Sequence, residues 1–208
     1  MEKNLKASQQ RAMQYWSADG LAELSTAALC FLLAIYFIVQ QLLPAAQGSF
    51  ALIFLIVFIA AFGVRKLMLW YRQRSTYPRT GFVEPKKGWE DRKFLGIAIV
   101  FTLLLLGFNL YMILRGIQTV ALMPALGGIM FAFMFALAAS RIKLVRFYFL
   151  AAFCLLLGVF LALSGLGDLW GAALLSLITG LVLLAFGIIT RLAYLRQANV
   201  VLEQADGR

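Results

Sequence analysis

The sequence predicts an all-α polytopic membrane protein, a bundle of six transmembrane helices arranged as three helical hairpins. Of the 208 residues, 63% are apolar and only 13% are charged, against about 25% charged in an ordinary soluble domain. The apolar residues fall into six continuous runs long enough to cross a bilayer as helices. Such runs differ from the alternating strands of a transmembrane barrel. A soluble globular protein is therefore excluded.

The chain begins with a polar segment, residues 1–24, which we expect to be a cytoplasmic amphipathic or interfacial helix and not a cleavable signal peptide. Tyr15 and Trp16 are placed there as an interfacial aromatic anchor. A partner-binding helix is the alternative interpretation of this segment.

The membrane domain is predicted to cover residues 25–190. Its spans are residues 25–43, 50–69, 94–114, 120–140, 147–164 and 170–190, and the only Lys, Arg, Asp or Glu residues within them are Arg65 and Lys66, near the end of the second span. Glu23 and Asp168 lie just before the first and sixth spans, where an acidic side chain favours the positive end of a helix dipole. A cytoplasmic tail, residues 191–208, follows the last span.

The basic residues predict the orientation. With six spans, the N-terminal segment, the second and fourth connections and the tail share one side, and only Arg115 among the 19 Lys and Arg residues falls on the other. The positive-inside rule then places both termini in the cytoplasm. The net charge of +10 is thereby explained without nucleic-acid binding.

The second connection, residues 70–93, is the most distinctive soluble stretch. Pro78 and Gly81 have the spacing of a type I turn. A solvated basic linker is the simpler interpretation, and an ordered loop that docks on anionic lipid or on a protein partner is the alternative. The candidate binding residues are Arg72, Arg74, Tyr77, Arg79, Lys86, Lys87 and Trp89.

Two short patterns carry a resemblance. Tyr15-Trp16-Ser17-Ala18-Asp19-Gly20-Leu21-Ala22-Glu23 and Thr76-Tyr77-Pro78-Arg79-Thr80-Gly81-Phe82 resemble stretches of small uncharacterised prokaryotic multi-pass membrane proteins. The resemblance implies a prokaryotic inner membrane, and it implies no activity and no functional residue.

Small residues at steps of four predict tight packing among the last three spans, because they let helix backbones approach. The stripes are Gly128, Ala132, Ala136 and Ser140; Cys154, Gly158 and Ala162; and Ala172, Ser176 and Gly180. A homodimer contact is the alternative use of these stripes.

Pro124, four residues into the fourth predicted span and close to Gly127 and Gly128, is expected to loosen or kink that span. A face of Phe50, Phe54, Phe58 and Phe62 in the second span could meet lipid, the core or an apolar ligand.

Polar residues within the spans are few. Asn109 is expected to hydrogen-bond a neighbouring helix, at Thr179 or Ser176, with a substrate contact as the alternative. Arg115 and Asp168 are the two charges on the outer side, and we expect them to form an ion pair.

No catalytic constellation is recognisable. The chain has no His, so the Ser-His-Asp and Cys-His arrangements are excluded. Cys30 and Cys154 are expected to be small packing residues, and no metal, cofactor or catalytic residue is assigned. The sequence thus favours a non-enzymatic scaffold, sensor or accessory subunit that engages anionic lipid or a protein partner. A small transporter or channel for an apolar or neutral solute, or a homo-oligomer, is the alternative.

Overall fold

A computed structural model of the chain describes residues 20–42, 122–166 and 168–206, together with single positions between residues 59 and 70 and between residues 93 and 115. The chain forms two compact units. One contains Met1–Tyr36, Gly48–Pro85 and Leu177–Arg208, and the other contains Phe37–Gln47 and Lys86–Ser176.

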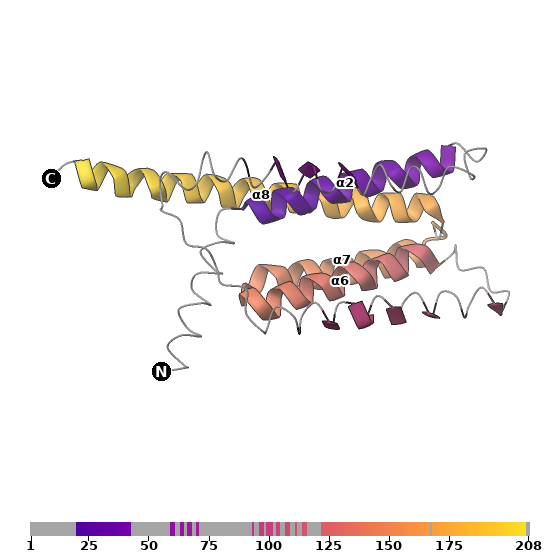
Figure 1. Cartoon of the computed structure of the whole chain (residues 1–208). Coiled ribbons are helices and arrows are strands. Elements are labelled where there is room, and N and C mark those ends of the chain that lie inside the picture. The colour runs from indigo at the N-terminus through magenta and orange to yellow at the C-terminus, as the bar shows by residue number, and fades with distance from the viewer. Residues whose placement is uncertain are drawn as a thin grey trace. The chain divides into compact units, whose positions relative to one another are not determined.

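Every regular element in the described part of the chain is an α-helix. The continuous helices are α2 (Leu21–Leu42), α6 (Met123–Ile142), α7 (Val145–Leu163) and α8 (Leu169–Asp206) (Figure 1). All four are long and apolar enough to cross a membrane, with a candidate span of Leu169–Tyr194 within α8. The predicted all-helical class is confirmed. The predicted spans 50–69 and 94–114 are described only at scattered positions, and all of these positions are helical.

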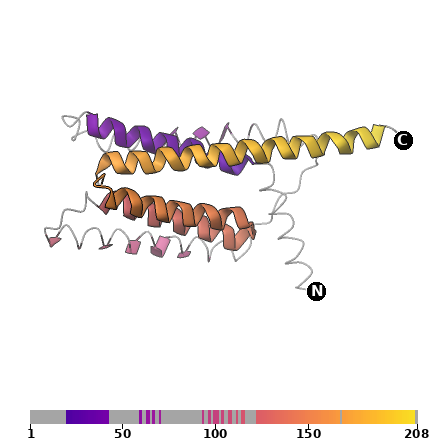
Figure 2. The ribbon, with the colours of Figure 1, turned by 180° about the vertical axis from the view of Figure 1, so that it is seen from behind.

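Helices α6 and α7 form an antiparallel hairpin in the second unit (Figures 1 and 2). Two residues, Lys143 and Leu144, connect them. Lys143 adopts the left-handed conformation (φ 57°, ψ 40°), and its N–H donates to the carbonyl of Ala139 at 2.7 Å. This arrangement satisfies a carbonyl at the end of α6 and reverses the chain.

The closest approach in this hairpin joins Gly128 of α6 and Gly158 of α7. A Cβ atom on Gly128 would lie 2.7 Å from the carbonyl oxygen of Cys154 and 2.8 Å from Cα of Gly158. Both partner atoms belong to the backbone of α7, so only glycine fits. The expected tight packing of these spans is confirmed at Gly128, Cys154 and Gly158.

The rest of the α6 stripe differs from the expectation. Beyond Gly128, the buried residues are Phe135 and Ala139, whereas Ala136 is half-buried and Ser140 is exposed. A step of four residues rotates by about 40° more than a full helical turn, so a strict step-of-four row leaves the contact within a few turns. The buried row corrects this drift with a step of seven between Gly128 and Phe135.

Pro124 lies in the first turns of its span, as expected. Helix α6 begins at Met123, so this proline lies in the first turn. An amide there has no partner within the helix, and proline is therefore accommodated without a kink. The expectation that Pro124 loosens or kinks the span is wrong, because α6 has no hydrogen bond to lose at this position.

The first unit pairs α2 with the C-terminal part of α8, and the two helices are antiparallel. A Cβ atom on Gly180 would lie 3.2 Å from Cβ of Cys30, and one on Gly187 would lie 2.9 Å from Cγ of Leu24. The first of these glycines belongs to the predicted α8 stripe, whose other members, Ala172 and Ser176, are buried as well. Sequence reasoning placed this stripe correctly and did not identify α2 as a partner.

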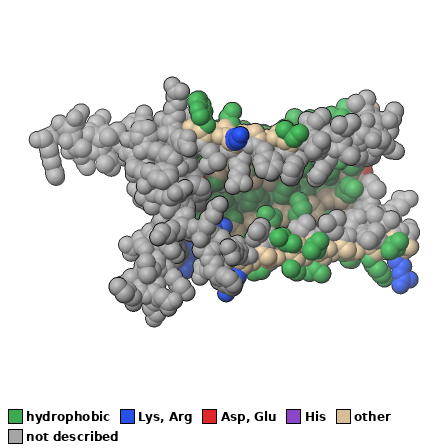
Figure 3. Space-filling view, viewed as in Figure 1, with side chains coloured by type: hydrophobic (Ala, Val, Ile, Leu, Met, Phe, Trp, Pro, Cys, Tyr) green, Lys and Arg blue, Asp and Glu red, His purple; other side chains and the backbone are tan. Residues whose placement is uncertain are grey.

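The exposed faces of these helices are apolar, which is the reverse of a soluble protein. On α7, Phe149 and Leu156 are each 70% exposed, while the opposite face of the same helix buries Cys154 and Gly158. Hydrophobic side chains also cover much of the described surface in Figure 3. A soluble protein rarely exposes such continuous apolar faces. The helices are those of an integral membrane protein.

Candidate functional site

Most of the candidate residues chosen from the sequence lie outside the described residues. These are Tyr15, Trp16, Arg72, Arg74, Tyr77, Arg79, Lys86, Lys87, Trp89 and Asn109, together with the phenylalanine face of the second span. The described candidates are Arg115 and Asp168.

Asp168 caps the N-terminus of α8. Its Oδ1 accepts the backbone N–H of Trp170 at 2.9 Å and that of Gly171 at 3.2 Å. These are the second and third residues of the helix, the two amides that an N-cap side chain satisfies. The expectation that an acidic residue favours this helix start is therefore confirmed, with a specific geometry.

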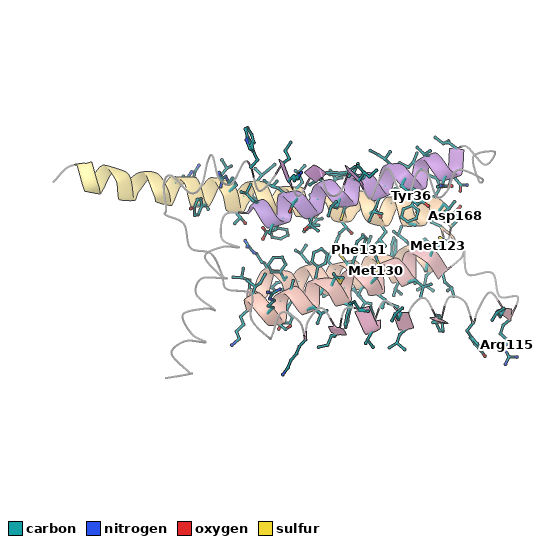
Figure 4. The ribbon with its side chains drawn as sticks, in the orientation of Figure 1. Tyr36, Arg115, Met123, Met130, Phe131 and Asp168 are labelled. Atoms are coloured by element: carbon teal, nitrogen blue, oxygen red, sulfur yellow. The ribbon has the colours of Figure 1, made fainter. Side chains whose placement is uncertain are left out.

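Arg115 and Asp168 do not form the expected ion pair. The guanidinium of Arg115 lies over the ring of Tyr111, 5.5 Å from its centroid. Figure 4 shows Arg115 well apart from Asp168, which lies at the start of α8. The pairing prediction is wrong because each charge has a closer partner within four residues along the chain.

The described part of α2 and α8 buries five polar side chains, namely Glu23, Gln40, Ser176, Thr179 and Arg191. The hydroxyl of Ser176 donates to the carbonyl of Ala172, one turn back in α8, at 2.9 Å. Ser25 and Thr26 of α2 donate to the carbonyl of Ala22 in the same way, each at 2.8 Å. Hydroxyls satisfied by their own helix need no partner on another helix.

Glu23 and Arg191 are two buried charges of opposite sign at one end of the first unit. Glu23 is 1% exposed, and Arg191 is 8% exposed. The crossing of the helices brings these turns together, because a Cβ atom on Gly20 would lie 3.0 Å from the backbone nitrogen of Arg191. The guanidinium of Arg191 also lies 5.8 Å from the ring centroid of Tyr194.

Sequence reasoning missed this pair of charges. It began the first span at residue 25 and so treated Glu23 as a cytoplasmic acid, whereas α2 begins at Leu21 and contains Glu23 in its first turn. Gly20, with φ +71°, marks the true start of the helix. The expectation that Glu23 favours a helix start is confirmed, because it lies in the first turn of α2, but that local signal did not indicate its burial or its proximity to Arg191.

Gln40 is the second buried feature that the sequence did not reveal. It is 4% exposed, and among the described residues neither its amide oxygen nor its amide nitrogen has a hydrogen-bond partner. An unsatisfied buried amide costs about 1–3 kcal/mol, so this position favours a polar occupant.

Within the described residues, no group of three or more His, Cys, Asp or Glu side chains is arranged to hold a metal ion. Cys30 and Cys154 are free and buried, as expected for packing residues. No protein-family model, curated protein or solved structure matches the chain. The geometry of the helices is therefore the basis for a functional proposal.

Proposed function

We propose that the chain is a six-span protein of a prokaryotic inner membrane, with both termini in the cytoplasm. The contact of Gly20 with residues 187 and 191 of α8 supports a shared side for the termini, because it brings the start of α2 and the exit of α8 together. In the six-span arrangement that side also carries every Lys and Arg except Arg115. Such a bias orients membrane proteins with their basic side inward.

Cysteine labelling in spheroplasts tests this topology. A membrane-impermeant maleimide should label Arg115→Cys in intact spheroplasts, and it should label Arg79→Cys only after permeabilisation. The wild-type chain is the control, because both native thiols are buried. Labelling of Arg79→Cys in intact spheroplasts would contradict the orientation.

We propose further that the protein is a non-enzymatic scaffold, sensor or accessory subunit whose cytoplasmic face binds anionic lipid. The observation that carries this proposal is the distribution of basic residues along the sequence, which puts 18 of the 19 on one side of the six-span arrangement, while the outward helix faces are apolar. Arg141, Lys143 and Arg146, at the α6–α7 turn, belong to that side in the six-span arrangement. Basic residues next to a bilayer attract acidic headgroups, by about 1 kcal/mol each.

Native mass spectrometry from nanodiscs that mix phosphatidylcholine and phosphatidylglycerol tests lipid binding. Changing Arg79, Lys86 and Lys87 to Gln removes about 3 kcal/mol of attraction, which corresponds to a roughly hundredfold weaker affinity. We expect fewer retained phosphatidylglycerol molecules in the triple variant. The control is Arg115→Gln, which removes a positive charge on the predicted outer side and should change nothing.

Equal phosphatidylglycerol retention by the triple variant and the wild type would overturn the lipid proposal. A stoichiometric protein that co-purifies from native membranes, and is lost from the triple variant, would replace lipid with a protein partner. Loss of phosphatidylglycerol from the Arg115→Gln variant as well would show that binding follows total charge and not the loop.

Gln40 favours a second candidate, a small transporter or channel for a neutral solute. Its unpaired amide could exchange hydrogen bonds with a polar, uncharged solute. Glycerol flux into proteoliposomes, followed by light scattering, tests this candidate. Flux above that of empty liposomes, lost in Gln40→Leu, would support it, and flux equal to that of empty liposomes would exclude glycerol-type solutes.

A further inference from the structure

The turn between α6 and α7 brings three positive charges together. Arg141 lies in the last turn of α6, Lys143 is the residue that ends this helix, and Arg146 is the second residue of α7. These three are the only charged residues between Arg115 and Asp168, so residues 116–167 contain no acidic side chain. The end of the hairpin, which Figure 1 shows, therefore carries three positive charges and none of opposite sign from its own sequence.

The local helix structure does not favour two of these charges. Lys143 has φ 57°, a conformation in which glycine is the favoured residue. Arg146 lies in the first turn of α7, where the positive end of the helix dipole favours an acidic side chain. Only Arg141, at the carboxyl end of α6, is placed as a helix dipole favours. Departures from local preference are expected at functional positions.

The three side chains remain accessible from outside the hairpin. Arg141 and Lys143 are exposed, and Arg146 is half-buried. The guanidinium of Arg146 lies 5.4 Å from the ring centroid of Phe147, whose side chain is buried in the hairpin. This contact keeps the positive charge of Arg146 beside the turn, where a negatively charged group can approach it.

An exposed apolar face of α7 begins at the same turn. Val145 is 68% exposed and Phe149 is 70% exposed. Tyr148, which is 51% exposed, provides a side chain suited to the boundary between headgroups and acyl chains. The exposed residues continue along the same side of the helix at Leu156, Phe160 and Leu163. A ligand at this turn therefore meets positive charge at one end and an apolar surface along its length.

We propose that the α6–α7 turn is a binding site for an anionic glycerophospholipid. Its phosphate lies among Arg141, Lys143 and Arg146, and its acyl chains follow the exposed face of α7. Basic residues next to a bilayer attract acidic headgroups, and a guanidinium matches the geometry of a phosphate. This inference rests on the proposed function, since it names a site at which the protein holds anionic lipid.

Other ligands match only one of the two features. A soluble phosphate compound would pair with the charges and leave the apolar side chains of Val145 and Phe149 uncovered. A zwitterionic lipid would cover these side chains but would bring no net negative charge to the turn. An acidic protein segment would have to displace the lipid that surrounds α7. An anionic lipid satisfies the charges and the apolar face together.

A fluorescent label beside the turn tests whether anionic lipid is enriched there. Val145→Cys places a thiol two residues after Lys143, and Leu163→Cys is the matched control on the exposed face at the other end of α7. Because Cys30 and Cys154 are buried, bimane labels the introduced thiol. In phosphatidylcholine nanodiscs that contain a small fraction of spin-labelled lipid, quenching reports the local concentration of that lipid.

We expect spin-labelled phosphatidylglycerol to quench the label at Val145→Cys several-fold more than spin-labelled phosphatidylcholine at the same fraction. The two lipids should quench equally at Leu163→Cys. The preference at Val145→Cys should disappear when Arg141, Lys143 and Arg146 are all changed to Gln. It should remain when Arg79, Lys86 and Lys87 are changed to Gln, which removes the same charge from residues 70–93.

Single substitutions guard against misfolding of the triple variant. Lys143→Gln should reduce the preference for phosphatidylglycerol, and Lys143→Arg, which keeps the charge, should retain it. Equal preferences in these two variants would contradict a role of the charge at this position.

Several outcomes would overturn the site. Equal quenching by the two lipids at Val145→Cys would refute it, and so would an undiminished preference in the triple variant of the turn. An equal loss in the triple variant of residues 70–93 would show that enrichment follows total charge. Displacement of the spin-labelled phosphatidylglycerol by millimolar glycerol phosphate would assign the turn to a soluble phosphate compound.

Failure of this site and failure of the proposed function give different results. Retention of phosphatidylglycerol in native mass spectrometry, together with equal quenching at Val145→Cys, would refute the site and leave the lipid-binding function in place. Absence of retained phosphatidylglycerol from the wild type would refute the function and this site with it.

Discussion

An alanine at Gly128 tests the close approach of α6 and α7. The added Cβ would lie 2.7 Å from the carbonyl oxygen of Cys154 and 2.8 Å from Cα of Gly158. Non-bonded carbon atoms are most stable at about 3.5–4.0 Å. Because both contacts are backbone atoms, a rotamer change cannot relieve them, and the helices must separate by roughly 1 Å at this point.

Overpacking of this kind costs about 1–3 kcal/mol. For a chain of about 200 residues, each kcal/mol lowers the unfolding temperature by about 2–4 °C. For a loss of stability near 2 kcal/mol, we therefore expect Gly128→Ala to lower the midpoint of thermal unfolding by roughly 4–8 °C. Gly158→Ala should have a similar effect, since its Cβ would lie 2.7 Å from both Cα of Gly128 and the carbonyl oxygen of Pro124.

The two buried thiols provide the assay. A maleimide dye that fluoresces on reaction reports unfolding as the cysteines become accessible during heating. In a Cys30→Ala background, the signal comes from Cys154 alone, which is fully buried at the α6–α7 contact. The matched control is Gly107→Ala, a helical glycine whose Cβ would meet nothing within 4 Å. Alanine there gains up to about 1 kcal/mol of helix propensity, so its midpoint should stay level or rise.

Equal midpoints for Gly128→Ala and the wild type would refute the argument that this contact admits only glycine. An equal loss in Gly128→Ala and Gly107→Ala would also refute it, because the loss would then come from alanine as such and not from the helix contact.

Three further expectations use the same thermal assay. Gly165 has φ +77° and open space around it, so Gly165→Ala should lower the free energy of unfolding by about 1–2 kcal/mol through backbone strain. Gly20→Ala should lower it further, because the added Cβ also meets the carbonyl oxygen of Gly187. Equal losses of stability in the two variants would disprove this second clash. Asp168→Ala should lower the free energy of unfolding by about 1 kcal/mol, and Asp168→Asn by only a few tenths, because asparagine is also a good N-cap. Equal unfolding temperatures for the two variants would argue against the cap. Lys143→Gly should raise the free energy of unfolding by about 1 kcal/mol, because it removes the strain of a left-handed backbone at a residue with a side chain. A lower unfolding temperature than that of the wild type would contradict this reasoning.

Hydropathy was sufficient to locate four of the helices. The observed ends of α6 and α7 lie within three residues of the predicted ends, because a long uncharged run permits one structure in a bilayer. The small residues Gly128 and Gly158 were also identified from sequence, since close backbone approach has a strong residue preference.

The buried polar residues could not be located in this way. Glu23 and Arg191 become buried because α2 and α8 are antiparallel neighbours, although 167 intervening residues separate the two positions. No local pattern encodes such a pairing. Asp168 illustrates the converse, since its role as a cap depends on residues two and three positions away and was visible locally.

Helix α8 is long and uninterrupted, so a small tilt at one end moves its other end by a large distance. The helix has 38 residues and is about 57 Å long, and no proline or break separates its membrane part from its tail. Helices tilt to match the thickness of the surrounding bilayer. A tilt of about 10° around the first turn of α8 would carry Asp206 sideways by about 10 Å. Lipid thickness would thereby be translated into displacement of the C-terminal end of the chain.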